Sequence, residues 1–239
     1  MPVGVIVNSI SIFAGGLLGA MLGNAIPERL RQTLPLIFGV ASMTMGSVSM
    51  VKLQALPAVI LALIIGTSLG ELINVEKAIE RAAAKIRVVI ETLLPGRGGR
   101  DNQEDFMEQF VGVLVLFCVS GTGVFGALQS GMTGDHTILL TKSILDLFTA
   151  AVFAASLGVI VSLIVIPQFI VMMALFLSAA VIMPLATPAM LADFTATGGV
   201  LMLATGFRIS GIRSFPIANM LPAMLLVMPI SFLWTKYLM

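Results

Sequence analysis

Long apolar runs are the feature that most constrains this chain. Residues 3–22 contain no charged side chain, and neither do residues 167–191. A helix needs about 20 apolar residues to cross the hydrocarbon core of a bilayer. Hydrophobic residues make up 58% of the sequence and charged residues 10%, against roughly 25% charged in an ordinary soluble domain. The sequence therefore predicts a multi-spanning membrane protein whose main partner is the lipid bilayer.

Composition and motifs exclude several classes of function. A net charge of +1 gives no electrostatic case for binding nucleic acid. Cys118 is the only cysteine and His136 the only histidine, so neither a disulfide framework nor a thiolate metal site is expected. The sequence contains no HExxH motif, P-loop or dinucleotide fingerprint. We expect no enzyme, no cofactor and no bound metal.

The apolar runs predict an all-α transmembrane bundle. Proline removes a helical hydrogen bond, so Pro184 and Pro188 should kink or break the sixth helix. Charged and apolar residues alternate with helical spacing over 75–93, which predicts an amphipathic helix at the membrane surface. The eight expected spans are residues 3–23, 34–50, 56–74, 106–120, 137–163, 167–191, 197–212 and 215–237.

Lysine and arginine are distributed unevenly between the two sides of this bundle. Of the 13 basic residues, ten fall in loops on one side and only Lys52, Lys142 and Lys236 on the other. The side richer in basic residues faces the cytoplasm in most membrane proteins. Both termini are therefore expected on the outer side, and the 75–105 segment on the cytoplasmic side.

A shift of 165 residues aligns the two ends of the chain. It pairs the LPA triplets at 56–58 and 221–223, and it also pairs Gly46 with Gly211 and Glu28 with Asp193. The displacement is five spans, an odd number, so the copies would be inverted in the membrane. The predicted parts are a first repeat (1–74), a cytoplasmic segment (75–105), a central hairpin (106–164) and a second repeat (165–239).

Inverted repeats with interrupted helices recur among secondary transporters, whose sites lie where the repeats meet. We therefore expect a transporter for a small solute or ion. The alternative is a membrane scaffold or assembly partner that transports nothing. The spacing of Gly15, Gly19 and Gly23 is typical of close helix packing and could equally join further copies of the chain in a homo-oligomer.

Four polar residues are the candidate solute-binding residues. Lys142 and Asp146 lie four residues apart, on one face of the fifth predicted helix. The alternative interpretation is structural, with Lys142 reaching the headgroups and Asp146 as its buried partner. Asn8 and Asn219 are polar residues within apolar runs, where an amide must face protein or water. Arg208 suits topology anchoring, or recognition of an anion.

Three segments together resemble a known family. They are GVIVNSISIFAGGLLGAMLG, LFCVSGTGVFGALQSGMTGDHTILLTKSILDLFTAAVFAASLG and GGVLMLATGFRISGIRSFPIANMLPAML. The chain resembles the YqgA/YdfK family of bacterial inner-membrane proteins, a family of unknown function, over nearly its whole length. The resemblance implies a multi-pass protein of the bacterial cytoplasmic membrane. It implies no particular activity.

Overall fold

The computed structural model describes residues 1–25, 27–79, 81, 110, 113–118 and 120–238. Its main helices are α1 (Val3–Leu22), α2 (Glu28–Met50), α3 (Leu56–Ile73), α6 (Gly121–Thr133), α7 (Thr137–Leu157), α8 (Val165–Ile182), α9 (Pro188–Ile209), α10 (Ile217–Met220) and α11 (Pro222–Tyr237). Three short 3-10 segments join them: η1 (Gly23–Ala25), η2 (Gly158–Ile164) and η3 (Met183–Leu185). The described residues contain no strand, so the all-α prediction is confirmed.

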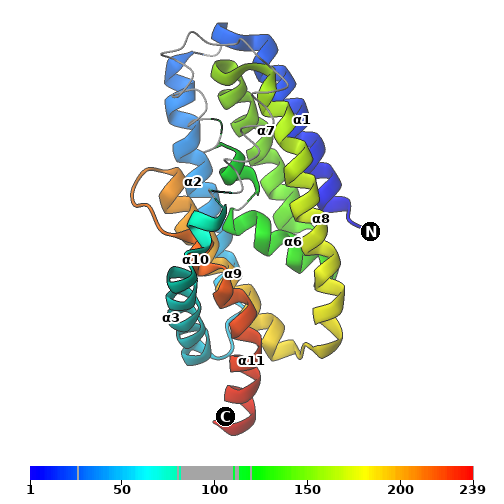
Figure 1. Ribbon diagram of the computed structural model, residues 1–239, viewed down its shortest axis with the longest axis vertical. Helices are drawn as coiled ribbons and strands as arrows, with labels where there is room; N and C mark the ends of the chain where they lie inside the picture. Colours follow the sequence, from blue (N-terminus) through cyan, green and yellow to red (C-terminus); the bar gives the residue numbers. More distant parts are fainter. Residues whose placement is uncertain (26, 80, 82–109, 111–112, 119, 239) are drawn as a thin grey trace.

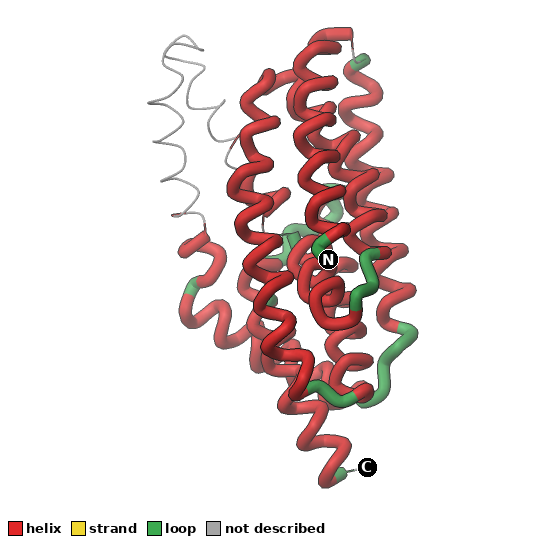
Figure 2. The backbone as a smooth tube through the Cα atoms, turned by 90° about the vertical axis from the view of Figure 1, so that its right-hand side faces the viewer, coloured by secondary structure: helices red, strands yellow, loops and turns green. Residues whose placement is uncertain are grey.

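The helices form an elongated bundle with the C-terminus at one tip (Figures 1 and 2). The predicted amphipathic helix begins in the described part, where residues 75–79 are helical. The rest of the 75–105 segment lies outside the described residues, except for position 81.

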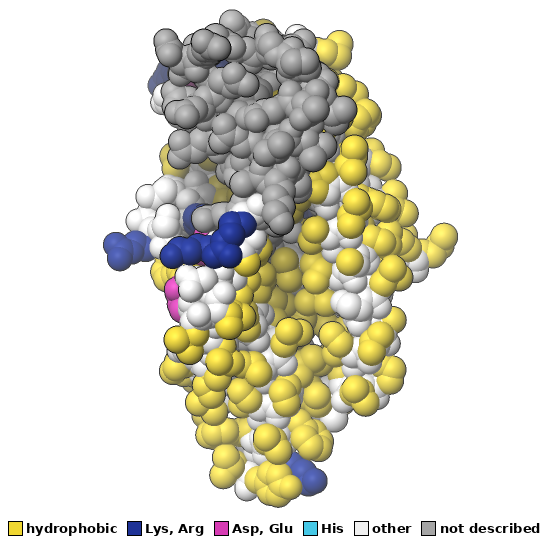
Figure 3. Space-filling model, viewed as in Figure 1, with side chains coloured by type: hydrophobic (Ala, Val, Ile, Leu, Met, Phe, Trp, Pro, Cys, Tyr) yellow, Lys and Arg dark blue, Asp and Glu magenta, His cyan; other side chains and the backbone are white. Residues whose placement is uncertain are grey.

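The outside of the bundle is apolar. Leu72 is 77% exposed, Val181 75% and Ile170 62%, and Figure 3 shows hydrophobic side chains over most of the described surface on one face. The largest apolar patch of a soluble monomer is typically a few hundred Å². These faces therefore suit contact with lipid.

Seven segments of the described chain are helical, long and apolar enough to cross a membrane. The longest, Thr137–Leu185, contains both α7 with 21 residues and α8 with 18. Between them the backbone turns at Gly158, whose φ of +78° favours glycine. Each of the two helices is near the length of one span. Counting them separately gives eight membrane-length segments in the described chain, which is the predicted number. The fourth covers Val113–Thr133, whereas most of the predicted span 106–120 lies outside the described residues.

Pro184 and Pro188 interrupt the predicted sixth helix, as the sequence predicts. α8 ends at Ile182, η3 contains Pro184, and α9 begins at Pro188 behind an N-cap at Thr187. Proline suits the first helical position because the amide hydrogen that it lacks would have no partner there. The predicted boundary at 191–197 therefore lies inside α9.

Glycines let the helices approach closely. A side chain at Gly15 would clash with the carbonyl oxygen of Leu147, and one at Gly19 with the carbonyl oxygen of Ala151. Both contacts join α1 to α7 in the same chain. In the same way, Gly46 faces Gly199 between α2 and α9, and small-residue contacts of this kind are common in membrane helix packing.

The predicted repeats have helices that pack in matching pairs. α2 contacts α9, and α3 contacts α11, which are helices that the 165-residue shift pairs. α1 and α8, the third pair, also contact each other, but α1 packs mainly on α7, which lies outside both repeats. An axis relating the two copies would place such partners together. The inverted relationship itself remains a prediction.

α6 lies inside the bundle and is the second part of a broken helix. Residues 113–118 are helical, Ser120 is extended, and α6 starts at Gly121. The Ser120 hydroxyl accepts a hydrogen bond of 3.1 Å from the backbone amide of Gly123 and so caps α6. From Gly121 onward α6 runs as a helix through its glycines to Thr133. Its glycines permit close packing, as at Gly131 against α8.

Candidate functional site

The Lys142–Asp146 ion pair is buried in the bundle. Both residues lie on the inward face of α7, one turn apart, and their side chains are 5% and 9% exposed. The ammonium nitrogen of Lys142 contacts Oδ2 of Asp146 directly. Burying charges in a membrane protein is costly unless they are paired, so the pairing explains how the two can stay there. The Lys142 side chain therefore lies inside the bundle, against Asp146.

Asn8 connects this pair to α1. Its side-chain amide donates a hydrogen bond of 2.7 Å to Oδ2 of Asp146. Its own carbonyl oxygen accepts a hydrogen bond of 2.8 Å from Nε2 of Gln168, which lies on α8. Oγ of Ser9 lies 2.9 Å from Oε1 of Gln168. The buried polar chain thus joins α7, α1 and α8 and fixes the orientation of both amides.

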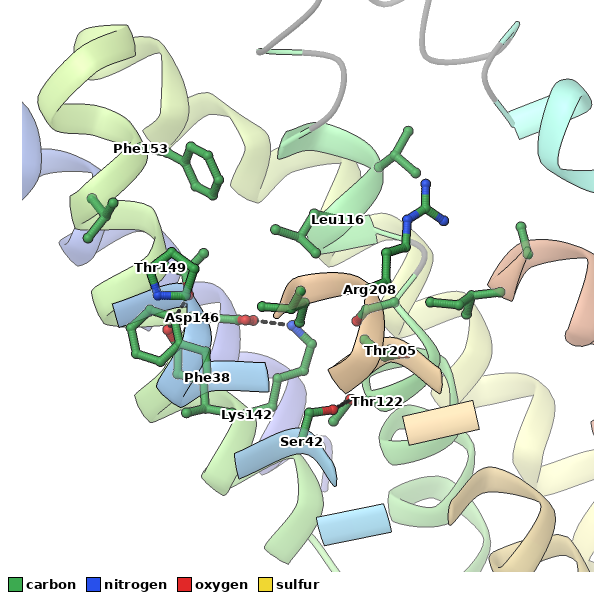
Figure 4. A pocket seen from close by; sticks show the side chains of 18 of the residues that line it. Phe38, Ser42, Leu116, Thr122, Lys142, Asp146, Thr149, Phe153, Thr205 and Arg208 are labelled. Atoms are coloured by element: carbon green, nitrogen blue, oxygen red, sulfur yellow. Dashed lines mark hydrogen bonds and ion pairs between the residues drawn. The ribbon is translucent and has the colours of Figure 1, made fainter. Parts of the chain in front are cut away.

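A cavity of about 610 Å³ opens beside the ion pair. Lys142 and Asp146 form part of its wall, together with Ser42, Thr122, Thr149 and Thr205 (Figure 4). The hydroxyls of Ser42 and Thr122 lie 3.2 Å apart and join α2 to the first turn of α6. Much of the remaining wall is apolar. Ligand pockets commonly measure about 300–1,000 Å³ and have this mixture of apolar surface and a few polar groups.

A second ion pair lies in the wall of the same cavity. Arg208, near the end of α9, donates a hydrogen bond of 2.9 Å from Nη1 to Oε1 of Glu76. The backbone amide of Glu76 donates one of 2.8 Å to Oδ1 of Asn219. The side chains of Arg208 and Glu76 are 40% and 20% exposed, so this pair is nearer to solvent than Lys142–Asp146.

The structure therefore brings three of the four predicted residues together. Lys142 and Asp146 line the cavity. Asn8 does not line it but donates a hydrogen bond to Asp146. Asn219 is buried and does not line the cavity, but it holds the backbone of Glu76, which does. Each asparagine thus fixes one acidic residue of the cavity wall.

Sequence reasoning missed Glu76 and Gln168 as site residues. Glu76 sits in a segment whose charges were assigned to a membrane-surface helix. Gln168 had a detectable signal, because it and Ser178 are the only polar side chains of α8. A lone amide in an apolar helix needs a partner, and here that partner is Asn8.

The beginning of α6 shapes the space around Lys142. A side chain at Gly123 would meet the Cε atom of Lys142 at 3.1 Å, so glycine leaves room for the lysine stem. The Lys142 ammonium also lies 5.7 Å from the ring centre of Phe117, within the range of cation–π attraction. The lysine is therefore held against the break in the helix.

Asp193 forms a separate, fully satisfied polar site. Oδ1 accepts hydrogen bonds of 2.9 Å from the backbone amides of Gln54 and Ala55, which precede α3. Oδ2 accepts one of 2.6 Å from the Ser231 hydroxyl. The carboxylate is buried and anchors the start of α3 to α9 and α11. Glu28, its predicted equivalent, is exposed on α2, so the two acids have different roles.

Within the described part of the chain, no three His, Cys, Asp or Glu side chains lie close enough together to hold a metal ion. A second cavity of about 470 Å³ is lined by apolar side chains and Cys118. It offers no charged group among the described residues. Of these two cavities, the one beside Lys142 and Asp146 therefore has the charged side chains.

A bundle of membrane-length helices with an apolar exterior and a buried ion pair beside a cavity defines an integral, multi-pass membrane protein. Over residues 3–232 the chain matches the family described as "Protein of unknown function (DUF554)", and it belongs to that family. It is 47% identical to the uncharacterized protein YqgA of Escherichia coli K12 over 237 residues, 99% of each chain. It is 26% identical to the uncharacterized membrane protein YdfK of Bacillus subtilis 168 over 229 residues, 93% of each chain. No solved structure matches.

Proposed function

We propose that the protein transports a small solute or ion and binds it in the cavity beside Lys142 and Asp146. The observation that carries this proposal is that a buried ion pair forms part of the wall of a cavity inside an apolar bundle. A pair with a purely structural role would be sealed by packing. Here its charged groups face a space in which a solute can sit.

The interrupted backbone around the cavity supports the same proposal. The break at Ser120 places the start of α6 at the cavity, and Ser120 and Thr122 both line it. Broken helices leave polar backbone groups that can contact a solute, and they occur at the binding sites of many transporters. The non-helical segment between α9 and α10, which contains Pro216, is a second interruption of the helices. Ile217 and Ala218 of the short α10 line the same cavity.

Flux measurements in proteoliposomes test the proposal directly. The purified full chain is reconstituted and challenged with a panel of ions, amino acids, sugars and organic acids. We expect uptake of at least one of them, and loss of that uptake in Asp146→Asn. Asp135→Asn, a matched change on an exposed turn, should leave uptake intact. Absence of uptake across the panel, or an active Asp146→Asn variant, would contradict the assigned site.

The alternative role is a scaffold or assembly partner without transport. Gly15 and Gly19 already contact α7 within the chain. Assembly with further copies would therefore use other surfaces, such as the exposed apolar faces. Cross-linking in membranes, combined with a negative flux panel, would favour this alternative.

We further propose that the protein resides in the bacterial inner membrane with both termini in the periplasm. The basis is the ten-to-three distribution of basic residues between the two sides, together with membership of a family whose Bacillus subtilis member is named a membrane protein.

A further inference from the structure

Building on the proposed function, we propose that the cavity binds a small zwitterion with an apolar group. This is the chemistry of a free amino acid or short peptide with an apolar side chain. The arrangement that carries the proposal is the presence of two ion pairs, Lys142–Asp146 and Arg208–Glu76, in the wall of one largely apolar cavity.

The charge balance of the wall favours a ligand without net charge. Its charged side chains in the described part of the chain are two cations and two anions, and each cation is paired with one anion. A ligand with a net charge would add an uncompensated charge beside the buried Lys142–Asp146 pair. A buried charge without a partner is costly. A zwitterion adds opposite charges that existing groups can match.

Asp146 has an oxygen available for a ligand ammonium. Oδ2 accepts from both Lys142 and Asn8, whereas Oδ1 has no hydrogen-bond partner among the described residues. Asp146 lines the cavity, so the ammonium of a ligand bound there lies beside its carboxylate. A carboxylate oxygen held in this way suits an ammonium donor.

Lys142 and the start of α6 suit the carboxylate of the same ligand. The lysine ammonium has three donors, and the described residues accept from it only through Oδ2 of Asp146. Thr122, in the first turn of α6, is in the cavity wall, and the N-terminal end of a helix attracts negative charge. The group that suits a ligand carboxylate, Lys142, and the group that suits a ligand ammonium, Asp146, are thus one helical turn apart on α7.

The rest of the wall suits an apolar side chain. Phe38, Leu145, Val152 and Ile217 line the cavity, and they come from three helices, α2, α7 and α10. An apolar group placed against them would leave water, which favours binding. A strongly polar ligand such as a sugar would leave many of its hydroxyls without partners there, which is costly.

A matched set of three ligands tests the charge requirement. The full chain in detergent is titrated with L-phenylalanine, 3-phenylpropanoate, which lacks the ammonium, and phenethylamine, which lacks the carboxylate. A dipeptide of two phenylalanines extends the set to a longer zwitterion. Binding is followed by calorimetry and by the shift in thermal unfolding. We expect at least one zwitterion to bind, and both truncated ligands to bind at least about tenfold more weakly.

Charge-altering variants give an independent signature. Asp146→Asn leaves Lys142 as an unbalanced cation, so the preference should reverse toward 3-phenylpropanoate. Lys142→Gln leaves Asp146 unbalanced and should favour phenethylamine. If either variant fails to fold, Glu76→Gln at the more exposed pair provides the same test, with a shift toward 3-phenylpropanoate. Asp135→Asn should retain the original order of affinities.

The outcomes separate this inference from transport itself. Uptake of an ion or another solute without zwitterion binding would overturn the ligand class and leave transport standing. Equal binding of the truncated ligands would also overturn it. Neither binding nor uptake of anything in the panel would overturn both proposals.

Discussion

Asn8 on α1 donates a hydrogen bond of 2.7 Å to Asp146 on α7, although the two residues are 138 positions apart. The same asparagine accepts a hydrogen bond from Gln168 on α8. One amide therefore holds the acidic half of the buried ion pair and joins three helices. The function proposed for Asp146 depends on this support, because an acid that is free to move would not keep its carboxylate in place at the cavity wall.

Asn8→Ala should destabilise the protein. It leaves the amide of Gln168 buried without its acceptor and removes one donor from Asp146, and an unsatisfied buried polar group costs about 1–3 kcal/mol. Thermal unfolding in detergent measures the loss. Ser68→Ala provides the control, because that exposed hydroxyl bonds only to the carbonyl oxygen one turn earlier in α3. Equal stability of the two variants would refute the proposed support.

Gly19→Ala should disrupt the packing of α1 on α7. The added carbon would clash with backbone atoms of Ala151, which cannot rotate away. Overpacking of this kind typically costs about 1–3 kcal/mol. Gly126→Ala is the graded control, because its added carbon would meet only side-chain atoms of Ile138 and Leu139 at 3.0 Å. We expect a clearly larger fall in the unfolding temperature for Gly19→Ala, and the reverse order would contradict the packing.

These two sites illustrate what the sequence could predict. The spacing of Gly15 and Gly19 predicted a close helix contact, and the placement of Asn8 predicted an amide that faces protein or water. Neither pattern identified α7 as the partner, because the rotation and crossing of two helices depend on all their contacts together. Periodicity describes one helix at a time.

The same limit applies to the cavity. Lys142 and Asp146 are four residues apart, so their pairing could be predicted from local geometry. Glu76 and Arg208 are 132 residues apart, and only the folded chain brings them together. Asn219 was predicted as a wall residue for its polarity, but its position in the fold makes it a support for Glu76.

Asp193→Ala should destabilise the start of α3. The change leaves the backbone amides of Gln54 and Ala55 without their acceptor, at about 1–3 kcal/mol for each buried group left unpaired. Ser231→Ala removes a single donor to the same carboxylate and should cost less. Chemical or thermal unfolding ranks the two variants. A milder effect for Asp193→Ala than for Ser231→Ala would show that the carboxylate does not anchor this helix.

Asp135 should contribute a small stabilisation that disappears in acid. Hydrogen bonds from the side chain and backbone of Thr137 lower the pKa of this exposed carboxyl below its ordinary value of 3.8. A lowered pKa in the folded state means that the contribution is complete above the unfolded value and is lost as pH falls through the folded value. The difference in unfolding temperature between the natural chain and Asp135→Asn should therefore be constant near neutral pH and shrink below about pH 4. A difference that grew in acid would contradict this assignment.

Cysteine labelling decides the orientation of the chain. Cys118 is the only natural cysteine and is buried, so Cys118→Ala provides a background without reactive thiols. Lys52 and Arg213 are both exposed, and the proposed orientation puts them on opposite sides of the membrane. In intact cells, a membrane-impermeant maleimide should label Lys52→Cys and should label Arg213→Cys only after the membrane is opened. The reverse pattern would place the termini in the cytoplasm, and labelling of both positions from outside would require a different number of spans between them.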